Sequence, residues 1–289
     1  MTEVPVPDAS FSIDVCTGCG FVWFDAGEYQ QLPRVPGETR SVQKKISPEL
    51  AQRLALSRVE AIRRNARAGK ESPDEAWKYI PTLLGAPVEF DCEETRCTPY
   101  ATLILLVLIA AVSLFGFAGV LTPAQYGLIP AQWSRLGGLT FLTSFFLHSG
   151  LRHLAGNLYY LFVFGDNVED VLGRSRFLVL LTASTLVGGV AYVLTHDGSA
   201  TACIGASGGI SGILAYYALR FPNHRIGVLI FFVKWLRFPV TWYFAFWVLL
   251  QFLGVASGHG NVAYEAHIGG LMTGTVWFLA ERLAGERRG

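Results

Sequence analysis

Residues 100–121 read YATLILLVLIAAVSLFGFAGVL, a run of 22 residues without a charged side chain. The hydrocarbon core of a bilayer is about 30 Å thick and requires about 20 apolar residues in a helix, so this segment predicts a membrane span. The whole chain agrees, because 52% of its 289 residues are hydrophobic and only 16% are charged, against about 25% in a soluble domain. The sequence therefore predicts an all-α membrane protein.

Five later segments share this predominantly apolar character. Together with 100–121 they predict six spans, the others being 151–164, 177–195, 205–221, 238–256 and 262–280. The span 151–164 is short, but its flank 136–150 carries no charge other than that of a histidine, so the two can be partly embedded together.

The distribution of Lys and Arg predicts the orientation of these spans. Of the 23 Lys and Arg residues, 12 precede residue 100, whereas the predicted outer segments carry only Arg135 and Arg152. Cytosolic segments beside spans are enriched in these residues, so both termini are expected in the cytosol. No apolar stretch of signal-peptide length precedes Tyr100, which agrees with a cytosolic N-terminal region. A multi-pass protein of a bacterial inner membrane is the predicted location.

Polar side chains lie near the outer ends of the second, fourth and sixth predicted spans. These ends carry His153 and Asn157, then Ser207, then His267. All three spans enter from the outer face, so the four side chains are expected at similar depth. Taken alone, Ser207 is better explained by a hydrogen bond between helices and His267 by an internal polar partner. Four polar residues at one depth in a bilayer predict a functional site.

Small residues predict a close pairing of the fourth and sixth spans. Residues 203–212 read CIGASGGISG, and Gly270 and Gly274 have the small-xxx-small spacing of tightly packed membrane helices. His267 lies three residues before Gly270, on the same helix face. The pairing therefore predicts that Ser207 and His267 come within hydrogen-bond distance. A serine hydroxyl needs such a base to act as a nucleophile near neutral pH.

The nearest outer carboxylates are poor candidates for a third member of this pair. Glu265 is two residues from His267 and points to a different helix face, and Asp197 falls in a loop. A buried carboxylate is also expensive to desolvate. A Ser-His dyad is therefore the simpler prediction.

Three motifs at these positions resemble those of the rhomboid intramembrane serine proteases. Residues 148–157 match HxxxxHxxxN, residues 205–208 match GxSG, and residues 266–274 match AHxxGxxxG. The resemblance covers about residues 100–284 and implies a six-transmembrane-helix rhomboid bundle. It further implies an intramembrane serine endopeptidase that hydrolyses peptide bonds in or near transmembrane segments of other proteins and needs no cofactor for catalysis.

The resemblance also implies a role for each polar residue. Ser207 is the implied nucleophile and His267 the implied general base and later acid. His153 and Asn157 are four residues apart on one helix face and, with the Ser207 backbone N–H, fit the donors of an oxyanion hole. His148 is expected to order the first loop.

Two departures from the family pattern leave the reacting groups in place. The first loop has Trp133-Ser134-Arg135 where the family usually carries adjacent Trp-Arg, and Ser211 stands where some members place a tyrosine against the catalytic histidine. The main alternative is a catalytically inactive rhomboid-like protein that binds membrane helices. A six-span transporter is a more distant alternative. An internal repeat between the two halves would favour it, and the sequence shows none.

The polar N-terminal third contains a candidate metal site. Cys16 and Cys19 form a CxxC followed by Gly, a knuckle that can bind Zn²⁺ through two thiolates. Its surroundings resemble the second half of a TFIIB-like zinc ribbon, with Phe21 in place of a glycine. Such a site needs four ligands. Either the chain starts further upstream, or Cys92 and Cys97 complete the site, or no metal binds.

The predicted domain organisation has four parts: a ribbon-like segment at 1–35, a cytosolic linker at 36–99, the span domain at 100–284 and a cytosolic tail at 285–289. Within the linker, Ser47-Pro48-Glu49 starts an Arg-rich helix that Gly69 ends, either a solvated linker helix or one that lies on anionic lipid headgroups. The net charge of +1 offers nucleic acid little to bind. The predicted partners are transmembrane protein substrates and the lipid bilayer.

Overall fold

The computed structural model describes residues 2–5, 12–15, 22–23, 86–90, 97–230, 234–258 and 262–286. The chain divides into two compact units, Met1–Gly69 and Lys70–Gly289. In the first unit, three short strands form an antiparallel sheet in the order β1-β2-β3, and they span Thr2–Pro5, Ser12–Val15 and Val22–Trp23. The helix predicted to start at Ser47 lies outside the described residues.

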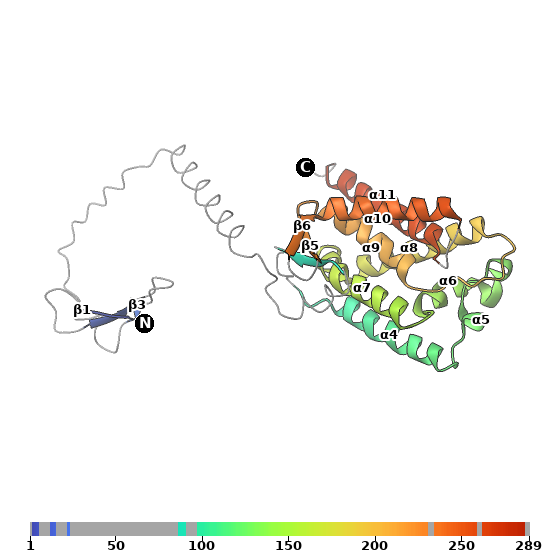
Figure 1. Cartoon of the computed structure of the whole chain (residues 1–289), viewed down its shortest axis with the longest axis horizontal. Coiled ribbons are helices and arrows are strands. Elements are labelled where there is room, and N and C mark those ends of the chain that lie inside the picture. Colours follow the sequence, from blue (N-terminus) through green and yellow to red (C-terminus); the bar gives the residue numbers. More distant parts are fainter. Residues whose placement is uncertain are drawn as a thin grey trace. The chain divides into compact units, whose positions relative to one another are not determined.

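The second unit is a bundle of helices (Figure 1). Its α-helices are α4 (Tyr100–Phe117), α5 (Pro123–Tyr126), α6 (Thr140–Thr143), α7 (Leu151–Leu172), α8 (Arg174–Thr195), α9 (Ser207–Arg220), α10 (Val240–Ser257) and α11 (Tyr264–Glu286). Three short 3-10 helices, η2 (Pro130–Gln132), η3 (Arg135–Gly138) and η4 (Ser144–Phe146), lie in the connection from α4 to α7. Each of the six predicted spans overlaps one of the six long helices, α4, α7, α8, α9, α10 and α11.

Within the described part of the chain, three helices are long and apolar enough to cross a membrane, namely α4, α8 and α10. The described residues are therefore mostly helical with candidate membrane spans, as part of the all-α prediction expected, while the count of six spans stays a prediction. Helix α7 continues eight residues beyond the predicted end at Phe164 and includes Asp166, Glu169 and Asp170. The helix therefore extends past the apolar run into a charged stretch.

A second small sheet, which the all-α prediction missed, pairs the segment before α4 with the two strands between α9 and α10. Strands β4 (Val88–Phe90), β5 (Arg225–Ile230) and β6 (Lys234–Pro239) pair antiparallel in that order. Phe238 belongs to β6, so the fifth long helix begins at Val240 instead of at 238. In Figure 1, β5 and β6 lie at one end of the bundle, and α5 and α6 lie at the other.

Strand β4 is fastened to the bundle by polar contacts. The hydroxyl of Tyr217 in α9 donates to the Glu89 carboxylate, and the Asn167 amide lies 3.4 Å from both oxygens of that carboxylate. The Tyr159 hydroxyl donates to the carbonyl of Pro87. Residues 86–90, placed by sequence in the linker 36–99, therefore pack against the helical unit.

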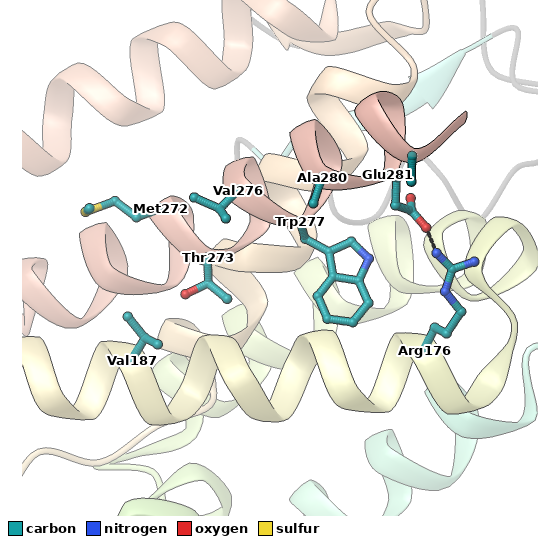
Figure 2. A pocket seen from close by; sticks show the side chains of 9 residues that line it. Arg176, Val187, Met272, Thr273, Val276, Trp277, Ala280 and Glu281 are labelled. Atoms are coloured by element: carbon teal, nitrogen blue, oxygen red, sulfur yellow. Dashed lines mark ion pairs between the residues drawn. The ribbon is translucent and has the colours of Figure 1, made fainter. Parts of the chain in front are cut away.

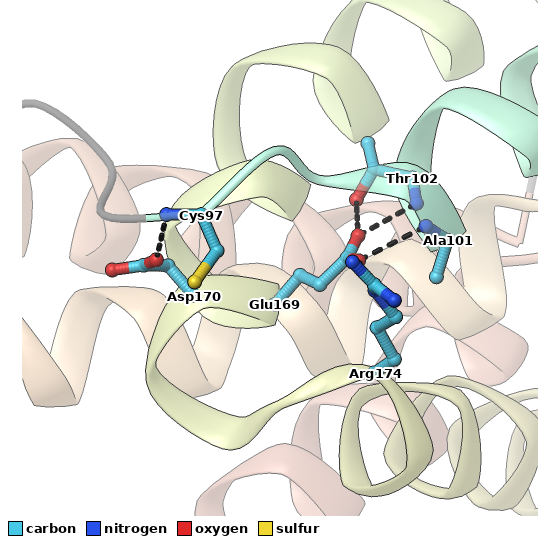
Figure 3. Close-up of polar contacts among 6 residues, drawn as sticks. All are labelled: Cys97, Ala101, Thr102, Glu169, Asp170 and Arg174. Atoms are coloured by element: carbon cyan, nitrogen blue, oxygen red, sulfur yellow. Dashed lines mark hydrogen bonds and ion pairs between the residues drawn. The ribbon is translucent and has the colours of Figure 1, made fainter.

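The N-terminus of α4 is capped by a carboxylate from α7 (Figure 3). One oxygen of Glu169 accepts the Ala101 backbone N–H at 2.9 Å, and the other accepts the backbone N–H and the hydroxyl of Thr102 at 2.7 and 2.9 Å. The Arg174 guanidinium lies 3.8 Å from the same carboxylate. The first N–H groups of a helix lack acceptors within the helix and favour a negative charge. The hydrogen bonds from these groups offset the cost of burying the Glu169 carboxylate.

Helix α9 forms the centre of the unit. Every residue from Gly208 to Ala218 is buried, and α9 contacts α7, α8, α10 and α11. Its glycines allow neighbouring helices to come close: a Cβ added to Gly212 would lie 2.0 Å from the Ser184 hydroxyl of α8, and one added to Gly274 of α11 would lie 2.1 Å from the Gly212 carbonyl oxygen. The helix that carries Ser207 is thus held on all sides.

Candidate active site

Ser207 is the first residue of α9 and follows a turn that favours glycine. Gly205 has a φ of +119°, in a region that side chains disfavour. Its N–H donates to the Ser144 carbonyl at 2.9 Å, and Cys203 pairs with Leu128 just before it. The first N–H groups of a helix have no acceptor within the helix. The Ser207 hydroxyl therefore lies beside backbone donors that can receive an anion.

His267 comes from the first turn of α11 and faces this serine. Its Nε2 lies 2.7 Å from the Ser207 Oγ. The contact depends on direct backbone packing of α9 against α11, because a Cβ added to Gly270 would lie 1.9 Å from the Gly208 carbonyl oxygen. The small residues that predicted this pairing are the residues at which the two helices meet.

A cavity of about 280 Å³ opens onto the two side chains. Its walls include all four residues that the sequence singled out within the spans, His153, Asn157, Ser207 and His267. They come from three helices, α7, α9 and α11, as the spacing of the motifs predicted.

His153 and Asn157 reach this cavity from α7. The Nδ1 of His153 lies 3.1 Å from the Ser149 Oγ, and its Nε2 would lie 2.7 Å from a Cβ added to Gly205. Asn157 is buried, and its amide nitrogen donates to the His153 carbonyl at 2.9 Å. An amide nitrogen carries two N–H groups, so one donor of Asn157 is left to serve a bound group.

Two residues of α10 contact His267 without having been predicted. The ring of Trp247 lies 6.0 Å from the imidazole, centroid to centroid, at an angle of 31°. The Oε1 of Gln251 lies 2.8 Å from the His267 Nδ1. Trp247 thus lies beside the imidazole. Some family members place a tyrosine against this ring, at the position where this chain has Ser211. Gln251 is the single carboxamide in the apolar segment 238–256, a signal that could have identified it.

The loop between α4 and α7 is ordered by side chains with polar partners. The Nδ1 of His148 lies 2.9 Å from the Ser113 hydroxyl of α4, and burial, followed by the nearby His153, lowers the pKa of His148 to about 4. His148 is therefore neutral at physiological pH. Arg135 donates to the carbonyls of Ala124 and Gly127. The position of His148 fits the expected role of ordering the loop.

Cys203 lies four residues before Ser207 and is not a competing nucleophile. Burial, followed by the nearby charge of Glu265, raises the pKa of the Cys203 thiol to about 12. The thiolate is the reactive form of cysteine. At neutral pH this side chain therefore stays a protonated, unreactive thiol.

A larger cavity, about 930 Å³, lies between α8 and α11, and neither Ser207 nor His267 lines it (Figure 2). Apolar groups such as Val187, Met272 and Trp277 form most of its wall, and an ion pair between Arg176 and Glu281 lies at one end. The Thr273 hydroxyl in its wall donates to a carbonyl of its own helix. Since this cavity pairs no nucleophile with a base, the smaller cavity is the candidate active site.

The predicted zinc ligands fall largely outside the described residues. Cys16 and Cys19 lie in the segment that connects β2 to β3, and they and Cys92 are not described. Cys97 is exposed, and its backbone N–H donates to Asp170 at 2.9 Å. Among the residues that are described, no group of three or more His, Cys, Asp or Glu could hold a metal ion. The zinc site stays a prediction.

The chain is also similar to known proteins. Residues 130–282 match the model of the Rhomboid domain. The chain is 30% identical over 152 residues to "Presenilin-associated rhomboid-like protein A, mitochondrial" of Danio rerio, which covers 52% of this chain and 38% of that protein. It is 29% identical over 162 residues to "Rhomboid protein 1, mitochondrial" of Saccharomyces cerevisiae, with 52% and 44% covered.

A bacterial protein is also similar. The chain is 29% identical over 176 residues to "Putative rhomboid protease YdcA" of Bacillus subtilis, which covers 60% of this chain and 80% of that protein. By contrast, the match spans less than half the length of the two mitochondrial proteins. The zinc-ribbon segment lies outside the matched residues 130–282.

Proposed function

Because this chain belongs to the rhomboid family, we propose that it is an intramembrane serine endopeptidase that hydrolyses peptide bonds in or near transmembrane segments of other membrane proteins. The observation that carries the proposal is the distance of 2.7 Å between the Ser207 Oγ and the His267 Nε2, beside a cavity. The reaction uses side chains of this chain alone.

The proposed reaction proceeds in two steps. The Ser207 Oγ attacks the scissile carbonyl carbon while its proton passes to the His267 Nε2. The C–N bond then breaks, and the imidazolium gives that proton to the leaving amine, which leaves an acyl group on Ser207. A water molecule then attacks the acyl carbon while its proton passes to His267, the bond from that carbon to the Ser207 Oγ breaks, and the imidazolium returns the proton to Oγ, which frees the carboxylic acid product and Ser207.

The oxyanion that forms in each step needs hydrogen-bond donors. The Ser207 backbone N–H, the Asn157 amide and the His153 Nε2 are the proposed donors, because all three residues line the cavity. The turn at Gly205 supports this arrangement, since its missing side chain leaves room for the His153 ring beside Ser207.

The proposed substrate is a transmembrane segment that unwinds near the outer face of the membrane. A helix keeps its carbonyl groups in internal hydrogen bonds, so a scissile carbonyl must leave the helix before Ser207 can attack it. Helix-breaking Gly or Pro and a small residue at the cleaved bond are the expected requirements. Substrate segments and the surrounding lipid bilayer are thus the proposed partners.

We also propose that all six long helices span the membrane, with both termini in the cytosol. The distribution of Lys and Arg supports this topology, since only Arg135 and Arg152 fall in the predicted outer segments. A bacterial inner membrane stays the predicted location. The names of two relatives specify mitochondria, and a third relative is from a bacterium.

Reconstitution with a model substrate tests the proposed activity. The purified protein would be incubated in liposomes with a transmembrane peptide that carries a Gly near its outer boundary, and the products would be identified by mass spectrometry. The wild type is expected to cleave, and Ser207→Ala and His267→Ala are expected not to. Ser199→Ala and His196→Ala are matched controls, because both residues lie outside the cavity.

Two outcomes would contradict the proposal. Equal cleavage by the wild type and both dyad variants would exclude the Ser-His mechanism. Binding of the peptide without cleavage by any protein would identify the chain as an inactive, rhomboid-like module that binds membrane helices.

A further inference from the structure

Gln251 is an unusual residue for its position. Along α10, which faces outward over most of its length, the buried residues are Val240 and Gln251, and Gln251 is only 5% exposed. Burying a carboxamide is costly unless its donors and its acceptor have partners. Here both ends are engaged, since Nε2 donates to the Trp247 carbonyl at 2.9 Å and Oε1 lies 2.8 Å from the His267 Nδ1.

The contact to Trp247 determines which way the carboxamide points. A backbone carbonyl can only accept a hydrogen bond, so the Gln251 nitrogen must face it and the Gln251 oxygen must face His267. The opposite orientation would bring two acceptor oxygens together at Trp247. Because Oε1 can only accept, the Nδ1 of His267 must carry a hydrogen.

This requirement selects one tautomer of the imidazole. A neutral imidazole has a hydrogen on one nitrogen and a lone pair on the other. With the hydrogen on Nδ1, the lone pair is on Nε2, the atom that lies 2.7 Å from the Ser207 Oγ. The serine hydroxyl then donates to Nε2, which is the geometry needed before proton transfer.

We propose that Gln251 is a positioning residue that holds His267 in the tautomer competent to accept the Ser207 proton. This inference rests on the proposed protease function. Gln251 takes the place that a carboxylate has in a catalytic triad, but it does so without a second charge. A neutral amide is the less costly choice in an apolar helix bundle. Trp247 limits rotation of the same ring from a second position on α10.

The test replaces Gln251 by residues of similar size. Gln251→Met removes the acceptor and the donor, whereas Gln251→Glu keeps an acceptor oxygen for Nδ1 and, when protonated, a donor for the Trp247 carbonyl. Leu250→Met is the matched control, because Leu250 is the neighbouring residue on α10 and is exposed. Three quantities would be measured: kcat and KM for a transmembrane peptide, labelling of Ser207 by a fluorophosphonate, and the tautomer of His267 by ¹⁵N NMR.

We expect Gln251→Met to lower kcat and the rate of fluorophosphonate labelling by about tenfold to hundredfold, because a buried N–H loses its acceptor and the other tautomer becomes accessible. KM should stay within about twofold, since Gln251 does not line the cavity. The NMR spectrum should show hydrogen on Nδ1 in the wild type and a mixture of tautomers in Gln251→Met. Gln251→Glu should recover most of the activity, and Leu250→Met should behave as the wild type.

Several results would overturn the inference. Hydrogen on Nε2 in the wild type would exclude it directly, without reference to activity or to any variant. So would a Gln251→Met protein that keeps wild-type kcat and a single Nδ1–H tautomer. If Gln251→Met does not fold, a folded Gln251→Glu protein with hydrogen on Nε2 overturns it equally. A wild type that cleaves nothing would instead overturn the proposed function, and the tautomer would still decide whether Gln251 positions the imidazole.

Discussion

Two pairs of helices hold the candidate site by different physical means. Helices α9 and α11 meet backbone to backbone, with Gly270 against the Gly208 carbonyl, whereas α10 meets α11 through side chains such as Gln251 and Tyr264. Side chains can change rotamer, but a helix backbone cannot move locally without losing hydrogen bonds. The separation of Ser207 and His267 is therefore rigidly set, while the orientation of the imidazole depends on a helix that is held more loosely.

The largest effect is expected where the rigid contact is broken. Gly270→Ala would place a methyl group where only 1.9 Å separates it from the Gly208 carbonyl oxygen, so α9 and α11 must move apart. A displacement of about 1 Å between reacting groups costs about 10²-fold in rate, and overpacking costs ~1–3 kcal/mol of stability or more. We predict activity below detection and a lower unfolding midpoint, measured by peptide cleavage and thermal unfolding in detergent.

Gly156→Ala is the control for the unfolding measurement alone, because a Cβ at Gly156 meets no atom within 4 Å but Gly156 lines the candidate active-site cavity. It adds the same methyl group to a long helix of the same bundle and should leave the unfolding midpoint unchanged. If Gly270→Ala retained full activity, the backbone contact would not determine the Ser207–His267 distance.

A smaller loss is expected at the turn that precedes Ser207. Gly205→Ala must adopt a φ of +119°, which costs about 1–3 kcal/mol for a residue with a side chain. Its methyl group would also lie 2.7 Å from the His153 Nε2, so that ring must move away from Ser207. We predict that kcat falls about tenfold to hundredfold, which corresponds to an increase of about 1–3 kcal/mol in the activation free energy. Peptide cleavage under saturating substrate measures it, and a normal kcat would remove His153 from the proposed oxyanion hole.

These sites differ in how far the sequence could predict them. The contact between Ser207 and His267 was predictable because depth in the membrane and the spacing of small residues can be read from the sequence, and both placed the two residues together. Gln251 was harder to predict, because α10 is apolar on all sides and its pattern does not reveal which face meets α11. The lone carboxamide was visible, but its partner depends on the rotation of the helix about its axis.

The elements that the sequence missed depend on contacts between distant segments. Strand β4 has three residues and pairs with β5, more than 130 positions further along the chain, so neither strand carries a signal of the other. Glu169 resembles any acidic residue at a helix end until α4 is placed against it. Local patterns therefore predicted the long helices, whereas the sheet and the cap required the three-dimensional arrangement.

The cap of α4 is expected to give an effect between those of the rigid and the loose contacts. Here the Glu169 carboxylate of α7, instead of a pair of glycines, holds the start of α4. Glu169→Gln puts an NH₂ group in reach of backbone N–H donors, so one or more of the three hydrogen bonds must be lost. We predict a decrease of ~1–3 kcal/mol in the free energy of unfolding and a decrease in kcat of less than about tenfold. Unfolding in mixed detergent micelles measures the first quantity. Asp170→Asn is the matched control, since its hydrogen bond is exposed, and an equal loss in both variants would show that the cap has no special role.

The smallest effect is expected on α10, where the same Gly→Ala change meets a side chain instead of a backbone. A Cβ at Gly254 would lie 2.5 Å from ring carbons of Tyr264, which is too close for an unchanged structure. The Tyr264 ring can rotate or α10 can shift, because this helix buries little else against the bundle. We therefore predict that Gly254→Ala changes kcat by less than about threefold and lowers stability by less than about 1 kcal/mol. A loss as large as that of Gly270→Ala, measured in the same cleavage and unfolding assays, would mean that α10 is held as rigidly as α9 and α11.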